Sequence, residues 1–192
     1  MVITFLINYK TMKKNLMTLA AVLCCTALFT SCGKNNPDQP EAPDTTPVSA
    51  VMTYKFTVTE DLFNAFTLTV EYYDAAGALK TETMTSAEWT KTIKSNKLPA
   101  TLGGRVTIKL KDGFDPTKEG VFSAKHLYHY EYYVVNKNNE KLGSTVSSSS
   151  NGGVDMAYNK VPDYAERYLD KPIMKFLFDF AADGTAKSGN WE

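Results

Sequence analysis

Apolar and polar side chains alternate along most of the chain after residue 50. Every second residue of 54–58 is aromatic or β-branched, and the same period of two returns at 66–72, 105–111 and 174–180. Successive side chains of a β-strand point to opposite faces, so this period predicts strands with one buried side and one polar side. Turn residues separate these segments at intervals of roughly 8 to 15 residues. We therefore expect residues 51–192 to form a single all-β domain.

The number and spacing of these segments predict an immunoglobulin-like β-sandwich of about seven to nine strands. The alternative is a lipocalin-like β-barrel, in which a closed sheet surrounds a ligand. One short helix is expected near 162–170, because Pro162 suits a first helical turn and Tyr164 and Tyr168 lie four residues apart.

Two neighbouring segments near the middle of the domain carry further predictions. Residues 122–135 are rich in aromatic and β-branched side chains and are expected to form the longest strand. Residues 140–147 are expected to pair with this strand. The serine-rich segment 147–153 is predicted to be a flexible loop because of its composition.

The first 31 residues have the anatomy of a secretory signal. Lys13 and Lys14 precede an apolar run from Leu16 to Phe29, and small residues follow that run. The run is shorter than the roughly 20 apolar residues that cross a bilayer. We therefore predict a signal peptide at 1–31, with Met12 as a candidate true start. An uncleaved membrane anchor and a plain secreted protein are the alternatives.

The end of this signal, Leu28 to Cys32 (Leu-Phe-Thr-Ser-Cys), resembles the lipobox of bacterial lipoproteins that signal peptidase II cleaves. Phe29 departs from the pattern, because leucine is usual at that position. The resemblance implies that Cys32 is lipidated, with palmitate among its acyl chains, and becomes the new N-terminus. It also implies a membrane partner through the anchor and a cell-envelope location at the outer membrane. Whether the domain faces the periplasm or the cell surface stays open.

The part of the chain after Cys32 is similar to small uncharacterised β-rich lipoproteins of gram-negative gut bacteria. The similarity lies in a Pro-rich tether at 32–50, a Trp-Thr-Lys-Thr element at 89–92 and a Leu-Pro-Ala element at 98–100. It covers most of the mature chain and implies no established activity. The tether has four prolines and few large apolar residues, so it is expected to stay extended and hold the domain away from the membrane.

Charge and cysteine content restrict the function classes. The whole chain has 21 basic and 21 acidic residues, and the predicted signal contains three lysines and no acid, so the mature chain has a net charge of about −3. Such a surface has no basic field for nucleic acid. All three cysteines lie at or before position 32, so the β-domain has neither a disulfide nor thiol chemistry.

Candidate residues for catalysis or metal binding are few. His126 and His129 are three residues apart on an expected strand, so they should point to opposite faces and cannot share a metal. The acidic loop from Asp112 to Glu119 lacks the spacing of a calcium-binding loop and is expected to be a solvated turn. We therefore predict no metal, no cofactor and no enzyme activity.

Tyrosines on the 122–135 segment are the candidate ligand-binding residues. Tyr128, Tyr130 and Tyr132 alternate onto one face, while Tyr133 falls on the other face. One of these two faces must belong to the core. If the other face is exposed, it is a polar aromatic strip of the kind that stacks on sugars or anchors a protein. The expected function is a non-catalytic binding or adhesion module with a glycan or envelope-protein partner. The alternatives are a structural or assembly component of an envelope complex and, with less support, a glycan-active enzyme.

Overall fold

The computed structural model describes residues 42–191. The predictions that concern the signal peptide, Cys32 and most of the tether fall outside these residues. In the described part, no helix has both the length and the apolar character needed to cross a membrane.

Strands dominate the described chain, in agreement with the all-β prediction. In chain order the elements are β1 (Ser49–Val58), α2 (Glu60–Ala65), β2 (Phe66–Tyr73), β3 (Leu79–Thr83), β4 (Glu88–Lys94), β5 (Ala100–Leu110), β6 (Val121–Ser123), β7 (His126–Val135), β8 (Lys141–Gly152), β9 (Asp155–Ala157), the 3-10 turn η1 (Tyr158–Lys160), α3 (Val161–Arg167), β10 (Met174–Phe180) and β11 (Ala186–Ser188).

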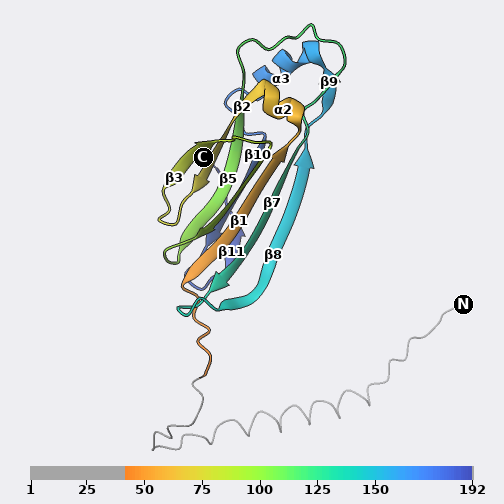
Figure 1. Cartoon of the computed structure of the whole chain (residues 1–192). Coiled ribbons are helices and arrows are strands. Elements are labelled where there is room, and N and C mark those ends of the chain that lie inside the picture. Colours follow the sequence, from red (N-terminus) through yellow and green to blue (C-terminus); the bar gives the residue numbers. More distant parts are fainter. Residues whose placement is uncertain (1–41, 192) are drawn as a thin grey trace, which may run out of the picture. The chain divides into compact units, whose positions relative to one another are not determined.

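Two antiparallel sheets pack face to face as a sandwich (Figure 1). One has four strands in the order β4-β1-β7-β8, and the other has five in the order β11-β10-β5-β2-β3. The sandwich prediction is confirmed, and the barrel alternative is wrong because the two sheets keep separate strand orders and do not join into one closed sheet. The short pair β6–β9, together with α2 and α3, lies at the end opposite to the start of β1 (Figure 1).

The alternation in the sequence becomes the division between core and surface. Met52, Tyr54 and Phe56 of β1 are fully buried, and β2 alternates between buried and half-buried positions along its whole length. Phe176 and Phe180 of β10 supply the facing layer of the core. Each large apolar side chain buried in this way contributes about 1.5–3 kcal/mol, so the core can hold the fold without a disulfide.

The predicted element boundaries need three corrections. The 147–153 segment is a strand and not a loop, because β8 continues to Gly152 in register with β7. The 122–135 segment divides into β6 and β7, and β8, with 12 residues, is longer than either. The helix near 162–170 is α3, which is shorter than predicted.

One helix is missing from the sequence-based prediction. The single turn and a half of α2 interrupts the alternation between two strands, and its buried Leu62 and Ala65 cover the end of the core. Six residues are too few to establish a helical period in the sequence.

The domain begins earlier than the predicted boundary at residue 51. β1 starts at Ser49, and the Val48 N–H donates to the Val135 carbonyl at 2.9 Å. The side-chain amide of Asn136 donates to the backbone carbonyl of Asp44 at 2.8 Å. The last residues of the predicted tether are therefore part of the folded domain.

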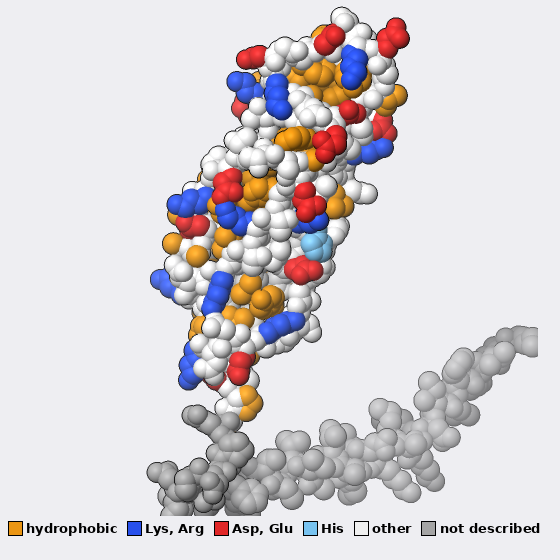
Figure 2. Space-filling model, in the orientation of Figure 1, with side chains coloured by type: hydrophobic (Ala, Val, Ile, Leu, Met, Phe, Trp, Pro, Cys, Tyr) orange, Lys and Arg blue, Asp and Glu red, His pale blue; other side chains and the backbone are white. Residues whose placement is uncertain are grey.

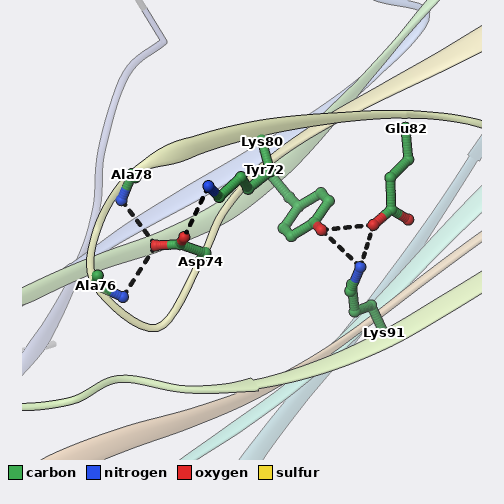
Figure 3. A network of polar contacts seen from close by, with 7 residues as sticks. All are labelled: Tyr72, Asp74, Ala76, Ala78, Lys80, Glu82 and Lys91. Carbon is green, nitrogen blue, oxygen red and sulfur yellow. Dashed lines mark hydrogen bonds and ion pairs between the residues drawn. The ribbon is translucent and has the colours of Figure 1, made fainter.

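A polar network links the two sheets on the side where β3 and β4 form their edges (Figure 3). The Glu82 carboxylate of β3 accepts hydrogen bonds from the Tyr72 hydroxyl at 2.6 Å and from the Trp89 indole at 3.0 Å. It also pairs with the Lys91 ammonium of β4. The donors and the acceptor come from both sheets, so the network closes this side of the sandwich.

Candidate binding surface at the edge formed by β7 and β8

The opposite side of the four-stranded sheet ends in β8, which pairs only with β7 within the described chain. Residues 146–152 of β8, which we call the open edge segment, keep a continuous register with β7, from Val146 opposite Tyr132 to Gly152 opposite His126. Before this segment, the register shifts between Tyr132 and Val134, and Gly143 adopts a φ of 70°. The open edge segment is thus a regular strand that begins after a bulge.

The open edge segment has no charged residue and no proline; its sequence is Val-Ser-Ser-Ser-Ser-Asn-Gly. Edge strands usually carry lysine, proline or other charges that prevent pairing with further strands. The other edges of the two large sheets carry such charges: Lys91 lies on β4, Lys80 on β3 and Lys187 on β11. The outer backbone groups of residues 146–152 are therefore the least protected edge of the sandwich.

The predicted tyrosine strip lies directly beside this edge. Tyr128, Tyr130 and Tyr132 stack on one another, with ring centroids 6.4 and 6.2 Å apart. All three point between the sheets, where Tyr130 contacts Phe178 at 4.9 Å and Tyr132 contacts Phe180 at 5.3 Å between ring centroids. They are half-buried, and burial raises the pKa of the Tyr132 hydroxyl. The three rings therefore line the core, and the side of the strip next to β8, which we call the tyrosine margin, faces the open edge segment.

Small side chains on β8 leave that margin open. Ser148 and Ser150 lie opposite Tyr130 and Tyr128, and Val146, opposite Tyr132, has 44% of its surface exposed. The inner side of the open edge segment therefore presents hydroxyls and one apolar group next to aromatic rings.

Tyr133 points to the outer face of the sheet, as the sequence predicted. The Lys141 ammonium lies 5.5 Å from the centroid of its ring. His129 is on the same outer face, where its Nδ1 is 2.8 Å from the Ser149 hydroxyl and its Nε2 is 3.3 Å from a Glu131 carboxylate oxygen. The four candidate tyrosines thus belong to two surfaces and not to one strip.

His126 occupies the inner side at the end of the same edge. A β-carbon on Gly152 would lie 2.5 Å from its Nε2, so this glycine lets the imidazole lie against β8. Burial lowers the pKa of His126, and a backbone contact with Ala124 opposes the effect. A surface hollow of about 630 Å³ adjoins this imidazole and extends over residues 57–59, 125–127 and 151–153.

Within the described residues, the side chains considered as metal ligands do not come together. His126 and His129 point to opposite faces, and no group of three or more metal-ligating side chains occurs in the described part. In the acidic loop, Asp115 accepts hydrogen bonds from the backbone and hydroxyl of Thr117, and Lys118 donates to the Tyr158 hydroxyl at 3.1 Å. Asp115 and Thr117 therefore pair within the loop, and Lys118 is held by a tyrosine outside it.

No family model matches the chain, and no curated protein or solved structure is significantly similar to it.

Sequence reasoning found the tyrosines but missed the open edge segment, because a serine run was interpreted as a loop. One available signal was the absence of charge from residue 142 to residue 154, immediately after a strongly predicted strand. Edge strands usually carry charges, so a segment without charges can be interpreted as an unprotected edge strand.

Proposed function

We propose that this chain is a lipid-anchored protein of the bacterial cell envelope that binds an extended segment of another envelope protein without catalysing a reaction. The observation that carries the proposal is the uncharged edge of β8, which leaves backbone donors and acceptors available to an additional strand. Main-chain hydrogen bonds then supply affinity, and the alternating side chains supply specificity.

The two sides of the edge define the chemistry of the partner. An added strand would lie about 4.8 Å from β8, and seven residues would span about 23 Å. Its inward side chains would lie near Val146, Ser148 and the tyrosine margin, which favours apolar or aromatic groups. Its outward side chains would lie near Ser147 and Ser149, which favours polar groups. The expected partner segment therefore alternates apolar and polar residues.

The location rests on the N-terminal sequence. The lipobox-like segment ending at Cys32 supports lipid attachment, and the proline-rich tether supports a domain held away from its membrane. A lipoprotein of this kind meets its partners within reach of the tether. The surface visible in Figure 2 mixes acidic and basic side chains, which suits recognition by shape and backbone pairing more than by a single-sign electrostatic field.

Cross-linking in intact cells tests the proposal. The double change Val146→Lys with Ser148→Lys places two charges on the open edge segment, and both positions are exposed, so the fold should be retained. We expect the cross-linked adduct of the native protein to be lost in this variant. Thr83→Lys, an exposed position on the edge strand β3, is the matched control and should retain the adduct.

Two outcomes would contradict the proposal. One is a native protein that yields only monomer, and the other is an adduct that persists in the double variant at native abundance. Mass spectrometry of the adduct would show whether the partner is a different protein or a second copy of this chain.

A further inference from the structure

The outer face of the five-stranded sheet carries a pocket of about 360 Å³. This pocket belongs to a different sheet from the edge of β8. Most of its lining side chains are polar or aromatic, and they come from four strands and the segment after β11. The lining residues are Tyr73, Leu79, Thr101, Arg105, Leu177, Asp179, Asn190 and Trp191.

The segment after β11 folds back over the sheet to form one wall of this pocket. The Gly189 N–H donates to the Leu177 carbonyl at 2.9 Å, and the Trp191 indole donates to the Phe176 carbonyl at 3.1 Å. A β-carbon on Gly189 would lie 2.8 Å from Asp179 Oδ2 and 3.0 Å from Leu177 Cδ2, so the segment passes close to these two side chains. Leu177 is 8% exposed although it lies on the outer face.

Two aromatic rings are held in place in the pocket. Trp191 stacks on Tyr73, with centroids 5.3 Å apart and an interplanar angle of 24°. The Arg105 guanidinium carbon lies 4.8 Å from the indole centroid, and its Nε donates to Glu71 at 2.7 Å. Because these contacts fix the rings before a ligand arrives, binding would cost little side-chain ordering.

Polar side chains line the pocket beside these rings. Thr101 and Asp179 are paired across β5 and β10, and the threonine hydroxyl donates to Asp179 Oδ1 at 2.6 Å. Asp179 Oδ2 is the second acceptor of this carboxylate. Asn190 is exposed and contributes its side-chain amide to the lining. The pocket therefore offers a carboxylate and an amide beside an aromatic wall.

We propose that this pocket binds a neutral pyranose, such as the terminal residue of an envelope or host glycan. The C–H face of a sugar ring is apolar and packs on aromatic side chains, while its vicinal hydroxyls pair with planar carboxylate and amide groups. The lining also contains the Arg105 guanidinium, but its charge is offset by its ion pair with Glu71. The Asp179 carboxylate therefore disfavours sugars that carry a carboxylate of their own. The volume is at the lower end of the range for ligand pockets, about 300–1,000 Å³, which fits one sugar residue better than a long chain.

Binding of the full-length, lipidated protein to immobilised oligosaccharides tests the inference. The protein is kept in a detergent without a sugar headgroup, so that the detergent does not compete. The probes are oligosaccharides ending in neutral glucose, galactose, mannose or N-acetylglucosamine, with uronate- and sialate-terminated oligosaccharides as the acidic arm. We expect binding to at least one neutral probe and weaker binding to acidic ones.

Variants locate that binding on the pocket. Trp191→Ala should weaken the neutral-probe affinity at least about tenfold, Asp179→Ala should weaken it comparably, and Trp191→Phe should recover part of it. Leu169→Ala, at an exposed position beyond the end of α3, is the control and should bind as the native protein does. Circular dichroism melts of each variant separate loss of the pocket from loss of the fold.

Three results would overturn the inference. These are binding to no neutral probe, binding to acidic sugars alone, and neutral-sugar binding that is unchanged in folded Trp191→Ala and Asp179→Ala. Loss of the cross-linked adduct at β8 has no bearing on this outcome, because the two surfaces belong to different sheets.

Discussion

Glu82 is the residue on which the closed side of the sandwich depends. Its carboxylate accepts a hydrogen bond from Tyr72 and pairs with Lys91 (Figure 3). It also accepts a hydrogen bond from Trp89, so three donors surround one partly exposed group. These donors, with the Lys91 hydrogen bond first among them, lower the pKa of Glu82 from its ordinary 4.5 to about 2. The ionised form is therefore the form that stabilises the fold.

The pH dependence of stability follows from the direction of this shift. A carboxyl group with a lowered pKa in the folded state contributes fully above its ordinary pKa, and the contribution disappears as the pH falls from about 4.5 to about 2. We expect Glu82→Gln to lower the free energy of unfolding at neutral pH by roughly 1 kcal/mol, after allowing for screening of a group 38% exposed.

Urea unfolding of the native protein and of Glu82→Gln across this pH range measures the effect. The difference between the two should shrink toward zero as the solution becomes acidic. A difference that stays constant between pH 5 and pH 2 would contradict the assignment, because it would not depend on ionisation.

Gly103 illustrates a different constraint, which is space. A β-carbon there would lie 2.5 Å from the Phe176 carbonyl oxygen and 2.7 Å from Leu177 Cα. Both atoms belong to the backbone of β10, so β5 and β10 would have to move apart to relieve the clash. Gly103→Ala should therefore destabilise the domain by about 1–3 kcal/mol in chemical unfolding. Thr81→Ala, exposed on β3, is the comparison and should be nearly neutral; equal effects would remove the steric explanation.

At the level of elements, β8 is the main departure from expectation. Its serines alternate between the two faces and pair with β7, residue by residue, from 146 to 152. We expect hydrogen exchange to show protected amides in this segment where the N–H groups face β7, and faster exchange where they face outward. Uniformly fast exchange across 146–152 would indicate a loop and would also remove the basis for strand addition.

The periodic parts of the sequence were predictable, and the reason is burial. β1, β2, β5 and β10 each have one face in the core, so their composition had to alternate. β8 has almost no buried face, so nothing in its composition had to alternate. The tyrosines of β7 were predicted because one face of that strand is buried. The open edge segment beside them was missed because β8 has almost no buried face.

The pocket around Trp191 was beyond sequence reasoning for another reason. Its residues come from positions 73 to 191 and meet only because β2, β5 and β10 are neighbours in one sheet. Strand order depends on the packing of the whole domain, and the local pattern of any one strand carries no information about it.

At the level of the whole molecule, the domain is stabilised without a disulfide bond. No cysteine occurs after position 32, so the domain contains no disulfide. Addition of a thiol reductant should leave the Tm of the domain unchanged in a calorimetric scan. A lowered Tm would mean that the core described above is insufficient to hold the fold.

The proposed lipid anchor gives a second prediction at this level. Cys32→Ser should abolish incorporation of a labelled fatty acid and the signal cleavage that depends on it, because serine cannot form the thioether to lipid. Metabolic labelling followed by gel electrophoresis makes the measurement. Cys25→Ser is the matched control and should remain labelled; label retained in Cys32→Ser would refute the lipoprotein assignment.

The position of β1 has a mechanical consequence. The chain enters the domain through residues 43–48 and continues directly into β1, which lies between β4 and β7 in the centre of its sheet. If the N-terminal side is held at a membrane and the domain is pulled along the axis of β1, hydrogen bonds on both flanks of β1 would share the load in shear and would have to break together. Forced unfolding depends on the unfolding barrier, so this placement would make the domain resist a pull in that direction.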